Sequence, residues 1–305
     1  MDTPPSLLTA GLAILSALLY LIAVWRQALS LGAGEEGQRQ RIALVGAAAL
    51  IAHALAAYLP AQAGESSLGF YRVASLMFLS MGVISLVALL IRPLHTLLIV
   101  LFPLAALSIL VATFAPDTSR PMSDLPPGIL SHVSASIISF AVLALAVLQG
   151  LLVTLQAQRL RQHRGRGVIR KLPPLEAASA LFYELTGTGF LILTVAIGTG
   201  VIFIEDLFGQ QLVHKTILTL LAWCLYAVLV IQYLRRGWRV QSAITVNLIA
   251  FGLIVLGFFG SKLVLELLLP LLLPLAGFGI TGTLLFLEKE CPINTLDMCK
   301  YFMVH

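Results

Sequence analysis

The chain has 305 residues, of which 59% are hydrophobic and only 11% are charged, and its mean hydropathy is +0.98. Soluble domains carry about 25% charged residues, and a folded chain of this length cannot hide so much apolar side chain from water. The composition therefore excludes a soluble globular enzyme and a disordered protein. The apolar runs are continuous, not alternating, and reach the roughly 20 residues that cross a bilayer, which predicts a polytopic helical membrane protein rather than a β-barrel.

Eight apolar runs predict an all-α bundle of eight transmembrane helices. No Lys or Arg precedes the first run, and a secretory signal would begin with a basic segment. We therefore expect an uncleaved first helix with the N-terminus outside. Prolines fall at or near the ends of several runs, as expected for helix boundaries. The predicted helices cover residues 7–25, 42–59, 70–91, 94–115, 129–155, 178–204, 212–234 and 244–268.

The formal net charge of +5 comes from basic residues in short loops between the runs. Three Lys or Arg follow the first predicted helix, one follows the third, six follow the fifth and three follow the seventh. The loops after the second and sixth helices have none, and the loop after the fourth has one with two Asp. By the positive-inside rule this alternation predicts orientation in a bacterial inner membrane. It indicates contact with the lipid bilayer and no nucleic-acid partner.

The C-terminal end fits this pattern less well. Pro270 and Pro274 interrupt an apolar stretch that reaches Leu287, and a polar tail follows. We therefore divide the chain into a transmembrane domain, residues 1–269, and an extension, residues 270–305, with a possible ninth apolar segment.

Three histidines stand out, because ionisable groups inside membrane spans are costly. His53 lies within the second predicted helix, and His132 and His214 lie in the first turns of the fifth and seventh. The predicted topology brings all three toward the outer side, with the latter two at equal depth. Imidazole suits iron, copper and zinc, and haem iron is commonly held by axial histidine. The alternatives are an interfacial polar residue at a helix end and, for His53, a satisfied intramembrane hydrogen bond.

Other polar residues on the outer side have two interpretations each. Arg72 opens the third helix, where it can hold a carboxylate such as a haem propionate or serve as an interfacial anchor. Ser136 and Ser139 share a helix face with His132, where they can orient a ligand or simply let helices approach closely. The second interpretation is favoured, as it is for Gly198 and Gly200. No catalytic or nucleotide-binding motif occurs in a fitting context, so we expect no enzyme.

Several short segments occur in a fixed order along the chain: Ala52-His53-Ala54, Gly128-Ile129-Leu130-Ser131-His132, Pro173-Pro174-Leu175-Glu176, Gly198-Thr199-Gly200, His214-Lys215, Ala222-Trp223, Tyr226, Gly237-Trp238-Arg239 and Phe259-Gly260-Ser261-Lys262. As a set they resemble the cytochrome c assembly proteins of the CcsA/HemX type. The resemblance covers about residues 7–269 and is strongest to the small eight-helix inner-membrane branch.

The resemblance implies haem handling at the outer face, in c-type cytochrome biogenesis. By position His132 and His214 would be axial ligands of the iron of haem b, and His53 would be an inner or transit ligand. Expected partners are haem and other membrane or cytochrome-assembly proteins. One departure is that residues 116–127 and the loop after the sixth helix contain no tryptophan, whereas the assembly proteins proper carry a tryptophan-rich outward segment.

That departure leaves other functions open. One alternative is a non-haem membrane scaffold or a regulator, for example of tetrapyrrole synthesis. A small-solute transporter has less support, because no acidic pair lies in mid-membrane.

Overall fold

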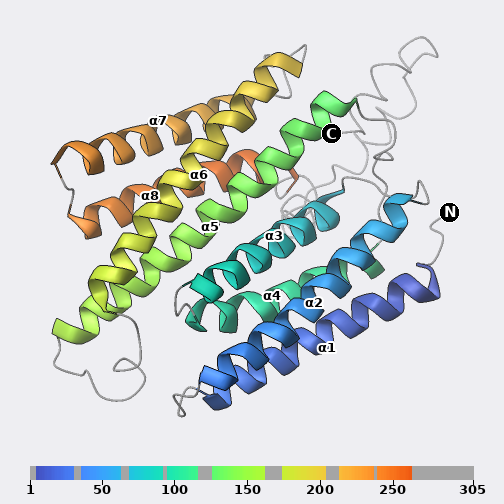
Figure 1. Cartoon of the computed structure of the whole chain (residues 1–305). Helices are drawn as coiled ribbons and strands as arrows, with labels where there is room; N and C mark the ends of the chain where they lie inside the picture. The colour runs from blue at the N-terminus through green and yellow to red at the C-terminus, as the bar shows by residue number, and fades with distance from the viewer. Residues whose placement is uncertain are drawn as a thin grey trace, which may run out of the picture. The chain divides into compact units, whose positions relative to one another are not determined.

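The computed structural model describes residues 5–30, 36–62, 69–91, 95–115, 126–161, 174–203, 213–236 and 239–262. Within these ranges all regular secondary structure is α-helical (Figure 1), and the eight helices are each long and apolar enough to cross a membrane. The predicted all-α architecture is therefore confirmed. The helices are α1 Leu7–Ser30, α2 Glu36–Gln62, α3 Phe70–Ile91, α4 His95–Phe114, α5 Pro127–Arg161, α6 Leu175–Phe203, α7 Val213–Arg236 and α8 Val240–Lys262.

Every predicted helix is present, and most are longer than predicted. The largest difference is in α5, predicted over 129–155 and observed over Pro127–Arg161. Hydropathy marks only the part of a helix that lies in the bilayer, whereas backbone hydrogen bonding continues through polar residues at its end. At 1.5 Å per residue α5 is about 52 Å long, so it extends beyond a hydrocarbon core of about 30 Å.

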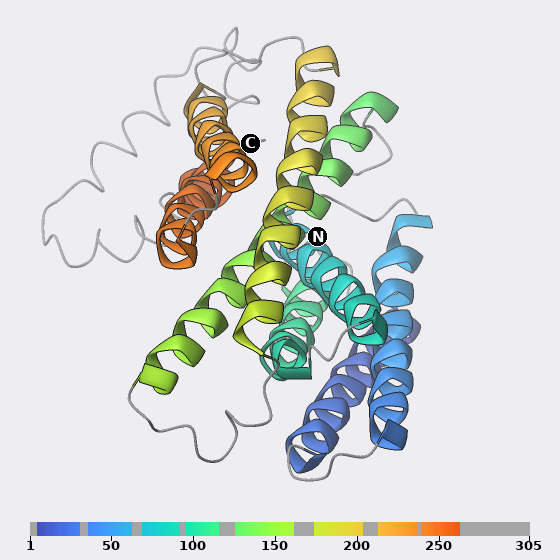
Figure 2. The same ribbon diagram turned by 60° about the vertical axis from the view of Figure 1, so that its left-hand side comes forward.

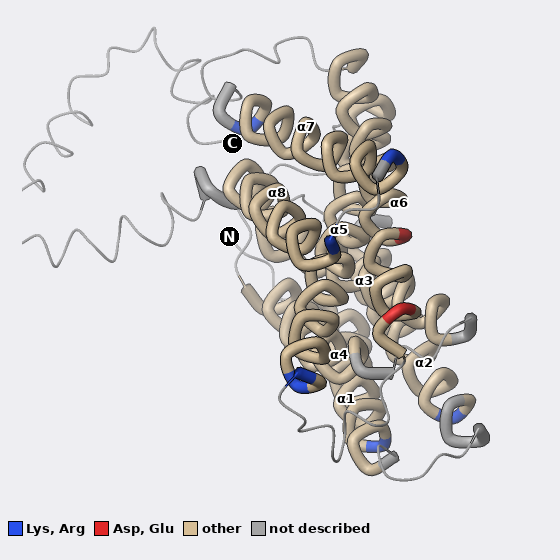
Figure 3. Tube along the Cα trace, turned by 90° about the vertical axis from the view of Figure 1, so that its left-hand side faces the viewer, with Lys and Arg blue, Asp and Glu red and all other residues tan. Residues whose placement is uncertain are grey.

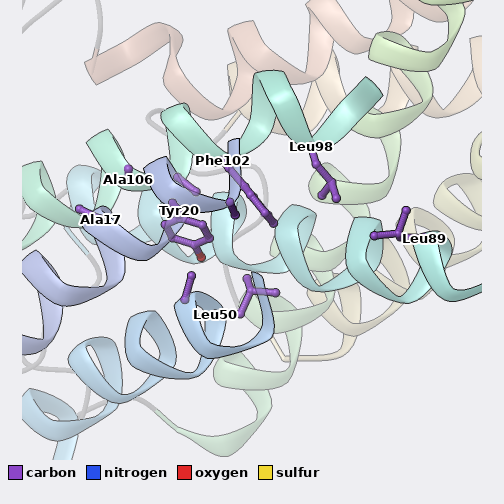
Figure 4. Close-up of a cluster of buried hydrophobic side chains, with 10 residues drawn as sticks. Ala17, Tyr20, Leu50, Leu89, Leu98, Phe102 and Ala106 are labelled. Carbon is purple, nitrogen blue, oxygen red and sulfur yellow. The ribbon is translucent and has the colours of Figure 1, made fainter. Parts of the chain in front are cut away.

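Helices α1 to α4 pack around one apolar core. α1 contacts α2 and α4, and α3 contacts the same two helices. Buried side chains from all four helices form this core, among them Tyr20, Leu50, Leu89 and Phe102 (Figure 4). Ala17, Ala49 and other alanines in the cluster keep the helices close, as expected where van der Waals packing must hold helices together in lipid.

Helices α5 to α8 share a second core, and α5 and α6 form its most extensive pair (Figure 2). A Cβ added at Gly189 of α6 would lie 2.5 Å from Leu143 Cδ2 of α5, so the bare glycine permits this close approach. Further along the bundle a buried cluster draws on all four helices: Val153, Ala178, Phe182, Leu229, Ala243 and Ile244. Helix α3 also contacts α5.

Charge is distributed as a bilayer requires. The Lys, Arg, Asp and Glu residues that the structure describes lie toward the helix ends, and the middle of the bundle is free of them (Figure 3). Many large apolar side chains are exposed along the helices, as at Leu44, Leu191 and Val201, where lipid is their solvent. The predicted extension, residues 270–305, lies outside the described residues.

Candidate functional site

The structure places the three predicted histidines in different settings. His53 lies in the interior of α2 and is fully buried. His132 is the sixth residue of α5 and is half-buried. His214 is the second residue of α7, and its side chain is outside the description. The geometry therefore allows a direct comparison of His53 with His132.

His53 uses both of its ring nitrogens. Its Nδ1 lies 3.1 Å from the Tyr20 hydroxyl oxygen of α1, and its Nε2 lies 2.8 Å from Ser75 Oγ of α3. Each hydroxyl can donate or accept, so the two partners satisfy either neutral tautomer of the ring. This arrangement leaves no nitrogen open for a metal, and it corresponds to the satisfied intramembrane hydrogen bond weighed in the sequence.

Apolar groups surround this hydrogen-bonded triad. The Tyr20 ring meets the His53 ring edge-on, with centroids 5.9 Å apart, and lies 5.0 Å from the Phe102 ring of α4. Ser16 Oγ of α1 donates to the carbonyl of Ala49 in α2 at 2.9 Å. Hydrogen bonds between membrane helices contribute about 0.6 kcal/mol each on average, so the set pins α1, α2 and α3 together.

His132 uses only one ring nitrogen. Its Nδ1 lies 2.7 Å from the carbonyl oxygen of Ala196 in α6. A carbonyl only accepts, so the proton of the neutral imidazole must be on Nδ1, which leaves the lone pair on Nε2. Among the described residues Nε2 has no hydrogen-bond partner. A backbone carbonyl behind one nitrogen and an open second nitrogen is the usual arrangement of a metal-ligating histidine.

The predicted equal depth of His132 and His214 is not what the helix bounds give. α5 begins at Pro127, earlier than expected, because proline is well accommodated in the first turn of a helix. His132 therefore falls in the second turn of its helix and His214 in the first turn of its own. Counted from the two helix starts, His132 is four residues further in, or about 6 Å.

Helix α6 contacts both helices that carry the predicted axial pair. On the α5 side it offers the Ala196 carbonyl to His132. On the α7 side Trp223 Nε1 donates to Thr194 Oγ1 at 2.9 Å. The structure thus brings α5 and α7 to the same segment of α6. Whether the two imidazoles face each other stays a prediction.

Arg72 is the third residue of α3 and is half-buried. Ser75, the partner of His53, lies three residues further along the same helix. Residues three apart share a helix face. Arg72 therefore lies about one turn from the His53 triad, toward the end of α3 predicted to face outward.

The serines and glycines near His132 act mainly in packing. Ser139 is buried, and its hydroxyl donates to the Gly189 carbonyl of α6 at 3.2 Å. Gly198, by contrast, is exposed, and a Cβ there would have nothing within 4 Å. The small residues of α6 therefore divide between a face against α5 and a face away from it.

Sequence reasoning missed the partners of both histidines. A tyrosine inside an apolar run needs a partner for its hydroxyl, so Tyr20 was a detectable signal for the His53 triad. No comparable signal identifies the Ala196 carbonyl, because any residue supplies one. Among the described residues no group of three or more His, Cys, Asp or Glu could hold a metal ion. A haem iron needs only axial ligands from protein.

Comparison with known proteins gives consistent matches. The family model described as Cytochrome C assembly protein matches residues 41–269. "Inner membrane protein YpjD" of Escherichia coli is 26% identical over 238 residues, 77% of this chain and 90% of the relative. "Protein HemX" of Brevibacillus brevis is 25% identical over 134 residues, 43% of this chain and 49% of the relative. "Cytochrome c biogenesis protein CcsA" of Prochlorococcus marinus is 25% identical over 219 residues, 61% and 69% respectively. No solved structure matches.

Proposed function

The chain belongs to the cytochrome c assembly protein family, and from that premise we propose that it binds haem at the outer face of the membrane during c-type cytochrome biogenesis. It is a multi-pass membrane protein with eight apolar helices, and its similarity to an inner membrane protein indicates the inner membrane. Relatives named as cytochrome c biogenesis proteins support the process. We assign the chain no catalytic step.

The observation that carries the proposal is the state of His132. Its Nδ1 is fixed on the Ala196 carbonyl, and its Nε2 has no partner among the described residues. Neutral imidazole with an open nitrogen is the form that ligates iron. In the proposal His132 supplies one axial nitrogen and His214 the other. The group is haem b, whose iron would bring redox chemistry to the site.

Two further residues complete the proposed site. Arg72 pairs with a haem propionate, since a guanidinium fork matches a carboxylate. His53 serves in haem passage through the membrane. That role requires the Tyr20 or Ser75 hydrogen bond to open, because both nitrogens are otherwise occupied.

The test is an absorption spectrum of the detergent-purified full chain after incubation with haemin, in oxidised and reduced states. We expect a Soret band and a reduced α band that weaken in His132→Ala and His214→Ala. His163→Ala is the matched control, because His163 lies in the loop predicted to be cytoplasmic and is assigned no role. Full Soret intensity in the double variant, or no haem uptake by folded wild-type protein, would overturn the proposal.

The second candidate is a non-haem scaffold or regulator. The lack of tryptophan in residues 116–127 favours it, because the assembly proteins proper use a tryptophan-rich segment there. Its signature would be a stoichiometric protein partner that copurifies with haem-free protein. Haem uptake that depends on His132 would exclude the non-haem alternative.

A further inference from the structure

Gly200 of α6 lies directly against the His132 ring. It is buried, and a Cβ added to it would lie 2.9 Å from His132 Cε1 and 3.0 Å from His132 Nδ1. Carbon atoms in contact normally lie 3.5–4.0 Å apart. The imidazole therefore occupies the space that any other residue at this position would fill.

The same turn of α6 also supplies the hydrogen bond. Gly200 lies four residues after Ala196, whose carbonyl oxygen is 2.7 Å from His132 Nδ1. Residues four apart share a helix face. One helical turn thus offers an acceptor for the ring and a bare backbone beside it.

We propose that Gly200 is a positioning residue for His132. Its lack of a side chain lets the imidazole dock on the Ala196 carbonyl, which fixes the proton on Nδ1 and presents Nε2 to a ligand. The value of this arrangement for haem rests on the proposed function. The docking itself is a property of the haem-free chain and is measurable without haem.

Comparison with other glycines of α6 separates positioning from packing. At Gly189 a Cβ would meet Leu143 in the helix interface, so a methyl group there pushes two helices apart. At Gly198 a Cβ would meet nothing within 4 Å. At Gly200 it would meet the end of a side chain that can rotate. We therefore expect Gly200→Ala to displace the ring and break its carbonyl bond, with little change in thermal stability.

The experiment uses the full chain in detergent, labelled with ¹⁵N-histidine. The His132 signals are identified by their loss in His132→Ala. We expect the Nδ1–H tautomer in the wild type, a mixture of tautomers in Gly200→Ala and no change in Gly198→Ala. Haemin affinity should fall about tenfold in Gly200→Ala, as is typical when an outer-shell partner of a metal ligand is lost. It should stay at the wild-type value in Gly198→Ala.

The outcomes separate this inference from the proposed function. If Gly200→Ala keeps the wild-type tautomer and affinity while haemin binds through His132, the positioning role is wrong and the haem proposal stands. If the tautomer changes as expected but the wild type binds no haemin, positioning stands and the haem proposal falls. A fold defect in Gly200→Ala is resolved in the His132→Ala background. There the added methyl should cost nothing, and a persistent defect would contradict the proposal.

Discussion

The two described histidines of interest differ in what their neighbours allow. In the α1–α3 region His53 is fully buried, and two hydroxyls occupy both of its nitrogens. In the α5–α6 region His132 is half-buried, and a single carbonyl occupies one nitrogen. Hydroxyl partners satisfy either tautomer and close the ring to ligands, whereas a carbonyl selects one tautomer and leaves Nε2 open. The partner groups, rather than depth in the membrane, therefore distinguish a structural histidine from a candidate ligand.

The largest expected effect concerns haem bound to the purified protein. His132→Ala should lose most of the Soret band, because it removes the open nitrogen. His53→Leu should keep the band when haemin is added to detergent-solubilised protein, since no passage through the membrane is needed there. The measurement is a haemin titration of both variants followed by absorption. Loss of the band in His53→Leu alone would reverse the comparison.

Close packing of α5 on α6 should matter next. Gly189→Ala brings a Cβ within 2.5 Å of Leu143 Cδ2, and overpacking of this kind costs about 1–3 kcal/mol. A lower midpoint of thermal or denaturant unfolding in detergent would show this effect. Gly187→Ala is the control on the same helix, because a Cβ there would have nothing within 4 Å. Equal stability of the two variants would contradict the described α5–α6 interface.

The His53 triad should give a smaller loss of stability. Ser75→Ala removes the partner of Nε2, and we expect a cost of about 1 kcal/mol, within the range found for hydrogen bonds between membrane helices. Tyr20→Phe should cost a similar amount by removing the partner of Nδ1. Unfolding of the two single variants and the double variant would measure their coupling through His53. Strictly additive effects would show that the three side chains do not act as one network.

The smallest expected effect has the opposite sign. Asn247 of α8 is fully buried, and neither amide atom has a hydrogen-bond partner among the described residues. Replacing an unsatisfied buried polar group by an apolar one of similar size is neutral or stabilising. Asn247→Leu should therefore leave the unfolding midpoint unchanged or raise it. A lower midpoint would mean that the amide holds a group outside the described structure.

Sequence alone predicted the helices well, since hydropathy over 20 residues is a strong signal. All eight were expected, and Phe70–Ile91 matches its predicted range. The helix ends were less predictable, because Pro127 and the polar end of α5 extend the helix without adding hydropathy. His53 and His132 were identified as notable residues, but their different states were not. Those depend on which residues of other helices lie opposite, such as Ser75 and Ala196, and no local pattern encodes that register.

The most direct test of the comparison is selective modification of histidine nitrogens by diethyl pyrocarbonate in folded protein, followed by peptide mass spectrometry. The reagent attacks an unprotonated imidazole nitrogen that has a free lone pair. We predict rapid modification of His132, protection of His132 by haemin, and no modification of His53 until the protein unfolds. Unreactive His132, or reactive His53 in the folded state, would contradict the assignment of an open and a closed histidine.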